Sequence, residues 1–190
     1  MNYHRLIVLT GFMGSGKSAL GSKVASRTGA AFRDLDDEIE KLEGKKIRDI
    51  FREDGEDYFR QLERTCLNQL LSVKPLVLAL GGGAFAQPEI RSRITAHDGV
   101  TVFLDVPVQT LFERLKRNTN RPLLLDDDGQ MPDDDRLMKR IRELLAQREP
   151  VYRKADITVT VKPGWTHEQT TEEILKHLSE YERTARSQHQ

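Results

Sequence analysis

The segment best suited to chemistry is the glycine-rich run at residues 11–18, which reads GFMGSGKS. It matches the pattern G-x-x-x-x-G-K-[ST] at every fixed position, between a short apolar run and a helical pattern. Glycines let the backbone curl so that successive N–H groups point at phosphate oxygens, and the following helix adds the positive end of its dipole. Lys17 can then reach the β- and γ-phosphates, and the Ser18 hydroxyl can bind Mg²⁺. The alternative is a glycine-rich turn without a ligand, but the complete pattern in this context predicts a site for ATP or GTP.

Two aspartates, Asp34 and Asp36, follow the second apolar run at residues 31–33. In a parallel α/β sheet, ligands gather at the carboxyl ends of the strands. On an extended segment, side chains two residues apart point the same way. One carboxylate can then serve Mg²⁺, directly or through water, while the other meets the hydroxyl that attacks the γ-phosphate. The alternative is a helix cap, a role that we expect of Asp37 at the start of a helix near Glu38.

Three consecutive glycines, Gly81, Gly82 and Gly83, follow the apolar run at residues 76–80. Because glycine has no Cβ atom, such a turn lets the backbone come very close to a ligand. An ordinary strand-ending turn is the alternative, but one glycine usually suffices for that. The three glycines therefore predict a binding surface.

Arginines lie where they could hold an anion. Arg60 follows Phe59 at the start of an amphipathic pattern, Arg121 lies in a long polar loop, and Arg148 ends a helical pattern at residues 135–147. Guanidinium groups are suited to two-pronged capture of carboxylate or phosphate. A single arginine in a chain with this many basic residues is more often a solvated surface charge, so spacing alone leaves both interpretations open.

Five short β-rich runs alternate with helical patterns, and most of the runs are almost continuously apolar. Such runs are typical of strands covered on both faces of a parallel sheet. They predict right-handed crossovers and an α/β three-layer sandwich around a five-stranded parallel sheet. The runs comprise residues 6–9, 31–33, 76–80, 100–104 and 157–161.

Two segments depart from this alternation. Residues 38–58 are helical but highly charged, and we interpret them as a flap, which with the following helix spans residues 38–65. Residues 118–135 form a polar loop with two clusters of aspartates around Gly129, which is typical either of a functional lid or of a disordered segment. Because these aspartates would repel the phosphates of ATP, we expect residues 126–135 to face solvent while Arg121 folds inward. The polar tail at residues 181–190 is expected to be disordered.

The composition is typical of a soluble globular protein, with 37% apolar and 32% charged residues. Thirty basic residues balance thirty acidic ones, which argues against a general nucleic-acid or membrane-surface binder. No apolar run approaches the roughly 18 residues of a membrane helix, and the N-terminus lacks the features of a signal peptide. We expect a cytoplasmic protein with a single domain at residues 1–180. Cys66, the one cysteine, is expected to be buried, and the histidines have no zinc-ligand spacing.

Together these motifs resemble the shikimate kinase family from about residue 6 to residue 162. In chain order the matching motifs are residues 11–18, Asp34-Leu35-Asp36, Phe59-Arg60, residues 81–83, Arg121-Pro122-Leu123 and Arg148-Glu149-Pro150-Val151-Tyr152. The combination is far more specific than the phosphate loop alone. The resemblance implies the P-loop fold of nucleoside monophosphate kinases, with a mobile lid. It also implies ATP-dependent phosphorylation of the 3-hydroxyl of shikimate, in the route to aromatic amino acids.

The resemblance implies roles for individual residues. Lys17, Asp36 and Arg121 would be catalytic, with Asp36 orienting or deprotonating the attacking hydroxyl and Arg121 stabilising the transferred phosphoryl group. The substrate-binding residues would be Asp36, Arg60, Gly81, Gly82, Gly83 and Arg148, with the two arginines on the shikimate carboxylate. The ATP-binding residues would be Gly14, Ser15, Gly16, Lys17, Ser18, Ala19, Arg114 and Arg121, with Arg114 along the adenine. Mg²⁺ would be held by Ser18 and, through water, by Asp34, in a monomer whose partners are small molecules.

Two features depart from the family pattern. The lid is unusually acidic, and residues 162–165 are only loosely like the adenine-contacting loop, where Trp165 can cover the nucleotide or simply pack. The alternatives are a kinase of the same fold acting on gluconate or a nucleoside monophosphate, and a non-catalytic regulator that binds nucleotide. The first should lack the joint set of substrate residues, and the second should have lost Lys17, Asp36 or Arg121. All of these residues are present.

Overall fold

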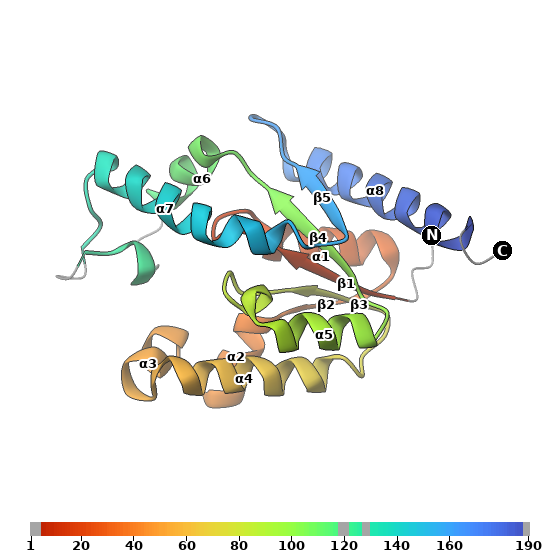
Figure 1. The fold of residues 1–190 in the computed structure, drawn as a ribbon, viewed down its shortest axis with the longest axis horizontal. Coiled ribbons are helices and arrows are strands. Elements are labelled where there is room, and N and C mark those ends of the chain that lie inside the picture. Colours follow the sequence, from red (N-terminus) through yellow and green to blue (C-terminus); the bar gives the residue numbers. More distant parts are fainter. Residues whose placement is uncertain (1–4, 118–121, 127–129, 188–190) are drawn as a thin grey trace.

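The computed structural model describes residues 5–117, 122–126 and 130–187, and at its centre is one sheet of five parallel strands (Figure 1). The strands lie in the order β2-β3-β1-β4-β5. Their bounds are Leu6–Thr10 for β1, Ala31–Asp34 for β2, Leu76–Ala79 for β3, Val100–Asp105 for β4 and Ile157–Thr160 for β5. Each strand coincides with one of the predicted runs, apart from a residue at its carboxyl end. The predicted α/β class and five-stranded parallel sheet are confirmed.

Burial accounts for the continuous apolar runs in the sequence. Every residue of β1 and β3 is buried, and β4 is buried as far as Leu104. Successive side chains of a strand point to opposite faces of a sheet, so a strand without an exposed residue is covered on both faces. The edge strand β2 is only partly buried. This pattern places the three central strands β3, β1 and β4 in the core between two layers of helices.

The helices pack in pairs around this sheet. Contacts join α1 to α8, α4 to α5, and α6 to α7. The helices outside the flap are α1 Lys17–Thr28, α5 Pro88–Ala96, α6 Val108–Leu115, α7 Asp134–Tyr152 and α8 His167–Ser187, with short 3-10 turns η1 at Ala84–Ala86 and η2 at Pro122–Leu124. Within the described ranges, no helix combines the length and apolarity needed to span a membrane.

The charged flap consists of three helices, α2 Leu35–Glu43, α3 Ile47–Glu53 and α4 Gly55–Leu70. Leu35, Ile39 and Ile50 are fully buried, so these few apolar side chains anchor an otherwise charged segment to the core. The first flap helix begins at Leu35 rather than near Glu38, which corrects the predicted boundary.

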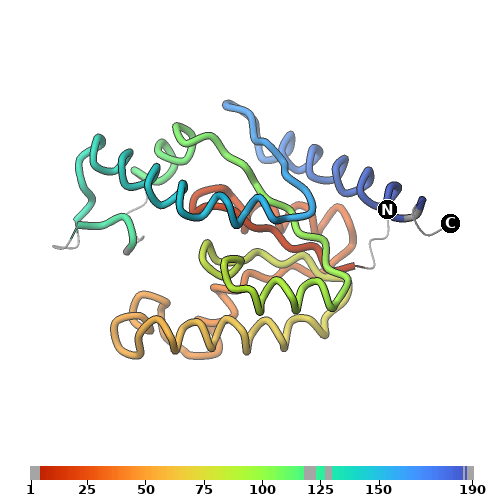
Figure 2. The backbone as a smooth tube through the Cα atoms, viewed as in Figure 1, coloured from red at the N-terminus to blue at the C-terminus, as the bar shows by residue number. Residues whose placement is uncertain are grey.

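Parallel pairing aligns the strand ends that carry the predicted site. Ala79 of β3 is the register partner of Leu9 in β1 and of Asp34 in β2. The segments that follow these three strands therefore begin at the same edge of the sheet. Figure 1 shows two groups of helices reaching past this edge, α3 with the start of α4 and α6 with the start of α7. Figure 2 traces the backbone in the same view.

The helix that carries Arg148 is longer than predicted. It was expected over residues 135–147, whereas α7 continues through Pro150 to Tyr152. Arg148 and Tyr152 are therefore four residues apart within one helix, and side chains with this spacing lie on the same face.

The expected disorder of the C-terminal tail is wrong for residues 181–187, which belong to α8. Leu178 is buried and Tyr181 packs against the core, so apolar contacts hold this part of the helix. The hydroxyls of Thr184 and Ser187 each donate a hydrogen bond to a backbone carbonyl one turn earlier. The polar composition of residues 181–187 had suggested disorder, but these residues continue the amphipathic helix α8.

Candidate active site

The glycine-rich loop between β1 and α1 has the conformation that an anion-binding loop requires. Gly14 and Gly16 have φ angles of 78° and 93°, in the left-handed region that favours glycine. Gly16 is the residue from which α1 starts, so the N–H groups of the first turn of α1 lie next to the loop. These N–H groups and the positive end of the helix dipole form an anion site.

Lys17 lies over this loop. Its Nζ donates hydrogen bonds to the carbonyl oxygens of Gly11 and Phe12, both at 3.0 Å, and to Ser15 Oγ at 3.5 Å. The side chain is partly buried, and its ammonium group is held within the curve of the loop. An anion bound by the loop N–H groups would meet this charge directly.

Ser18 and Asp34 join the start of α1 to the end of β2. Ser18 Oγ donates a hydrogen bond to Asp34 Oδ2 at 2.5 Å. A hydroxyl and a carboxylate oxygen side by side are ligands that Mg²⁺ accepts, since this ion uses few protein oxygens and takes the rest from phosphates and water. The described residues contain no group of three or more His, Cys, Asp or Glu that could hold a metal by themselves. The pair therefore fits a nucleotide-bound Mg²⁺ rather than a metal held by protein ligands alone.

Asp34 also caps the first helix of the flap. Its Oδ1 accepts a hydrogen bond from the Asp36 backbone N–H at 3.1 Å. The capping residue is thus Asp34, which corrects our expectation of Asp37. Burial, together with charge repulsion from Asp34, raises the pKa of Asp37.

The backbone around Asp36 is helical, not extended, which corrects the premise that Asp34 and Asp36 point the same way. Asp36 lies in the first turn of α2 and faces the turn that follows β3. A Cβ atom placed on Gly81 would collide with Asp36 Oδ1. The two aspartates therefore act at different points of the same edge, with Asp34 beside Ser18 and Asp36 beside Gly81.

The other two glycines of the turn make room for the two predicted substrate arginines. A Cβ atom on Gly83 would lie 2.9 Å from both Nη1 and Nη2 of Arg60, and one on Gly82 would lie 3.2 Å from Arg148 Nη1. Contacts of 2.9 Å are shorter than real Cβ atoms tolerate. The three glycines thus allow an aspartate and two arginines, from α2, α4 and α7, to converge on one backbone turn.

Arg60 is held in this place by two carboxylates of its own helix. Its Nη1 donates to Glu63 Oε2 at 2.8 Å, and its Nε and Nη2 donate to Glu56 Oε1 at 3.1 and 2.7 Å. The Glu63 side chain is 1% exposed and that of Glu56 is 63% exposed. Burial raises the pKa of Glu63, although the hydrogen bonds and charges of its neighbours act in the opposite direction. Glu63 was not among the predicted site residues, although its spacing of three residues from Arg60 is one at which helical side chains meet.

Tyr152 is a second residue without a predicted role. It is completely buried, its Oη donates a hydrogen bond to the Gly82 carbonyl at 2.5 Å, and its ring packs against Phe103. Burial raises the pKa of the hydroxyl, and the neighbouring Arg148 charge opposes this effect. Tyr152 therefore ties α7 to the glycine turn. Its place one turn after Arg148 was the available sequence signal.

Arg114 reaches the phosphate loop from α6. Its Nη1 donates to the Gly14 carbonyl at 3.0 Å and to the Ser15 carbonyl at 3.4 Å. The predicted ATP residue is thus beside the loop, where its stem and guanidinium group could flank a nucleotide. Ala19 is exposed in the first turn of α1, and Trp165 packs against the core with Lys162 Nζ 5.2 Å from its ring centroid.

The predicted lid is described only in part. Arg121, Asp127 and Asp128 lie outside the described residues. Asp126 was expected to face solvent, whereas it forms ion pairs with Arg136 at 3.0 Å and with Arg140 at 3.2 Å.

Side chains of α7 bind the described part of the acidic segment, which we define as residues 126–135. Arg140 Nη1 donates to the carbonyls of Leu124 and Leu125 at 3.1 and 2.6 Å. Asp133 is exposed, as expected, and caps α7 by accepting a hydrogen bond from the Arg136 N–H at 2.9 Å. Asp126 and Asp133 therefore hold the segment to α7 and do not only face solvent.

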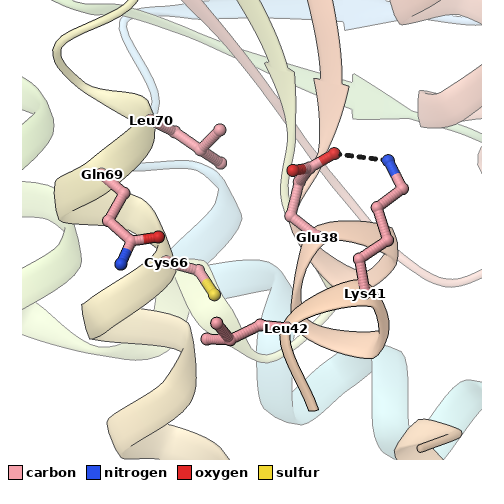
Figure 3. Close-up of a pocket in the computed structure, with 6 residues that line it drawn as sticks. All are labelled: Glu38, Lys41, Leu42, Cys66, Gln69 and Leu70. Carbon is pink, nitrogen blue, oxygen red and sulfur yellow. Dashed lines mark hydrogen bonds and ion pairs between the residues drawn. The ribbon is translucent and has the colours of Figure 1, made fainter. Parts of the chain in front are cut away.

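A separate hollow of about 240 Å³ between α2 and α4 is not part of this site (Figure 3). None of the predicted site residues that the structure describes lines it. Its lining includes Leu42, the ion pair of Lys41 with Glu38, and Cys66. Cys66 is buried, as predicted, and burial raises the pKa of its thiol.

Known proteins are similar to this chain in sequence and in fold. A sequence profile of the family described as shikimate kinase matches residues 13–179. The chain is 44% identical over 171 residues to the shikimate kinase of Persephonella marina, with 90% of this chain and 97% of that protein covered. The shikimate kinase of Acinetobacter baumannii, solved in complex with shikimate, superposes with a TM-score of 0.81 at 36% identity, covering 94% of this chain and 96% of that one. That of Bacteroides thetaiotaomicron gives 0.82 at 32% identity, covering 93% and 99%.

Proposed function

Because this chain belongs to the shikimate kinase family, we propose that it transfers the γ-phosphoryl group of ATP to the 3-hydroxyl of shikimate, giving shikimate 3-phosphate and ADP. The observation that carries this proposal is the convergence of Asp36, Arg60 and Arg148 on the triple-glycine turn, residues 81–83. This turn starts at the same sheet edge as the phosphate loop. A carboxylate for a hydroxyl and two cations for an acid group match the two ends of a small hydroxy acid.

The ATP side of the reaction would use the loop between β1 and α1. The loop N–H groups and Lys17 would hold the β- and γ-phosphates, and Arg114 would lie along the adenine. Ser18, and Asp34 through water, would hold Mg²⁺, which would neutralise part of the phosphate charge. Arg121 would supply a further positive charge to the transferred phosphoryl group, where charge stabilisation is the main source of rate.

The acceptor side would use the residues around the glycine turn. Arg60 and Arg148 would bind the shikimate carboxylate, with each charge-assisted contact contributing about 1.5–3 kcal/mol. Asp36 would orient the 3-hydroxyl and accept its proton as the oxygen attacks phosphorus. Because these roles are separate, replacing Arg60 or Arg148 should raise the shikimate KM, whereas replacing Asp36 should lower kcat. We further propose a cytoplasmic monomer that supplies the route to aromatic amino acids.

The direct test is shikimate-dependent ADP release by the purified chain, with gluconate and nucleoside monophosphates as competing acceptors. Activity should require Mg²⁺, and Lys17→Ala should lower it by orders of magnitude while the melting temperature is kept. Preference for gluconate or a nucleoside monophosphate over shikimate would overturn the proposed substrate. Nucleotide binding without turnover of any acceptor would indicate a regulator instead of a kinase.

A further inference from the structure

The buried carboxylate beneath Arg60 has a second donor from another part of the chain. Glu63 Oε2 accepts from Arg60 Nη1 at 2.8 Å and also from the Gln87 side-chain amide at 2.6 Å. Gln87 Oε1 in turn accepts from Arg64 Nη1 at 2.9 Å. Four side chains therefore form a continuous row, in the order Arg60, Glu63, Gln87 and Arg64. Three of them belong to α4, and Gln87 is the exception.

Gln87 comes from the segment that directly follows the triple-glycine turn. The backbone passes from Gly83 through η1, and Gln87 is the residue from which α5 starts. Its N–H donates to the Ala84 carbonyl at 3.1 Å, and Arg91 Nη1 donates to the Phe85 carbonyl at 2.6 Å. One backbone hydrogen bond and one from the Arg91 side chain thus fix where the Gln87 side chain begins. Its amide connects the glycine turn to the helix that carries Arg60.

The chemistry of the row fixes the orientation of the Gln87 amide. Arginine can only donate hydrogen bonds, and an ionised carboxylate can only accept them. Arg64 therefore requires the amide oxygen, and Glu63 requires the amide NH₂. A buried carboxylate that loses a donor is strongly destabilised, so Glu63 would move or take up a proton if the amide were absent. In either case the carboxylate would no longer hold Arg60 Nη1 as firmly.

We propose that Gln87 is a positioning residue for the substrate carboxylate site, which holds Glu63 in place and thereby keeps the Arg60 guanidinium against Gly83. This role rests on the proposed function, because Arg60 is the proposed partner of the shikimate carboxylate. Arg64 supports the same arrangement from the far side by fixing the amide. The row acts on substrate binding and leaves the phosphate loop untouched.

The first experiment compares Gln87→Leu with a matched control. Gln87→Leu should raise the shikimate KM about fivefold or more, while kcat and the ATP KM stay within about twofold. Asn68→Leu is the control, because Asn68 accepts a hydrogen bond from Arg93 and so also joins α4 to α5, without contacting Glu63. The control should leave the shikimate KM within about twofold. An unchanged KM in Gln87→Leu, or an equal rise in both variants, would overturn the proposal.

A double-mutant cycle separates positioning from general loss of structure. In the Arg60→Ala background, Gln87→Leu should add little further increase in shikimate KM, because the residue through which it acts is already absent. Independent, additive effects would contradict the proposed role. If Gln87→Leu does not fold, Gln87→Glu serves instead, since it retains an acceptor for Arg64 but places a like charge against Glu63. This variant should raise the shikimate KM at least as much, and an unchanged KM would overturn the proposal.

A measurement without substrate distinguishes this inference from the proposed function. Arginine side-chain NMR reports whether rotation of a guanidinium group is restricted, and the Arg60 signals are identified by their absence in Arg60→Ala. They should show restricted rotation in the unsubstituted chain and faster averaging in Gln87→Leu. Failure of the chain to use shikimate would overturn the proposed function, and unchanged Arg60 signals in Gln87→Leu would overturn the role of Gln87.

Discussion

Ser18 Oγ donates a hydrogen bond to Asp34 Oδ2 at 2.5 Å, which joins the helix after the phosphate loop to the strand end that begins the flap. Asp34 has two functions in this position, because its other oxygen caps α2. A hydroxyl that can bind Mg²⁺ and a helix that carries Asp36 thus share one carboxylate. The proposed nucleotide side and the proposed acceptor side of the site are linked through this residue.

The two functions of Asp34 can be separated by substitution. Asp34→Asn keeps a side-chain cap but loses the charge, so it should raise the Mg²⁺ concentration needed for half-maximal activity about tenfold with little loss of stability. Asp34→Ala should show the same defect and in addition lose about 1 kcal/mol of stability. Mg²⁺ titrations of activity and denaturant unfolding measure the two effects. A normal Mg²⁺ requirement in Asp34→Asn would exclude Asp34 from the metal site.

Glu56 and Glu63 both bind Arg60, but we expect opposite effects when each is neutralised. Glu56 occupies the Nε and Nη2 edge of the guanidinium group, so it would compete with the substrate carboxylate that we propose Arg60 binds. Glu56→Gln should therefore lower the shikimate KM, by no more than about fivefold because this pair is exposed. Glu63→Gln should raise the KM about tenfold, since a buried partner of Arg60 is lost. Steady-state kinetics on the two variants checks both signs, and a rise in KM for both would show that Glu56 supports binding.

Alanine at Gly81 and at Gly83 should impair different kinetic constants. Neither glycine has a positive φ angle, so the backbone accepts alanine and the effect comes from the added methyl group. Gly83→Ala should displace Arg60 and raise the shikimate KM, whereas Gly81→Ala should displace Asp36 and lower kcat, each about tenfold or more. Gly29→Ala is unsuitable as a control, because the backbone at Gly29 has a φ angle of 71° and alanine would be strained there. The same defect in both variants would mean that the turn acts as a single unit.

Tyr152→Phe tests the hydrogen bond between α7 and the glycine turn. The ring is kept, so the variant should lose about 1 kcal/mol of stability and bind shikimate modestly less well. Burial raises the pKa of Tyr152, so its stabilising contribution is complete below the unfolded value of about 10 and falls as the pH rises through the folded pKa. The stability difference between the unsubstituted chain and Tyr152→Phe should therefore shrink above about pH 10. A difference that stays constant across that range would contradict the assigned hydrogen bond.

The aspartates of the acidic segment should differ in their importance. Asp126→Asn removes partners from both Arg136 and Arg140 and should lower the melting temperature, as expected for a loss of up to about 1 kcal/mol. Asp135 is exposed, so Asp135→Asn is the matched control and should have no measurable effect. Arg121→Ala should by contrast lower kcat heavily and leave stability unchanged. Equal melting temperatures for the two aspartate variants would restore the view that the whole segment only faces solvent.

The local sequence pattern was sufficient to predict the strands and the phosphate loop. A buried strand needs a continuous apolar run, and an anion-binding loop needs glycines, Lys17 and Ser18 in a fixed order, so both are written in neighbouring residues. The order of motifs along the chain was likewise sufficient to predict the family. Helix ends were less predictable, because Asp34 and Asp37 are both good caps in sequence and only the contact with the Asp36 N–H distinguishes them.

The parts that only the tertiary structure decided are contacts between segments far apart in the chain. The sequence showed three glycines and several arginines, but not that each glycine leaves room for one particular side chain. Spacing along a helix was the only sequence signal for Glu63 and Tyr152, and Gln87 had none, because the contacts of Gln87 with Glu63 and of Tyr152 with Gly82, at 2.6 and 2.5 Å, join different elements. Hydrogen bonds of this kind depend on how α4, α5 and α7 pack against the sheet. Residue types along the chain therefore determined what chemistry is present, and packing decided which groups meet.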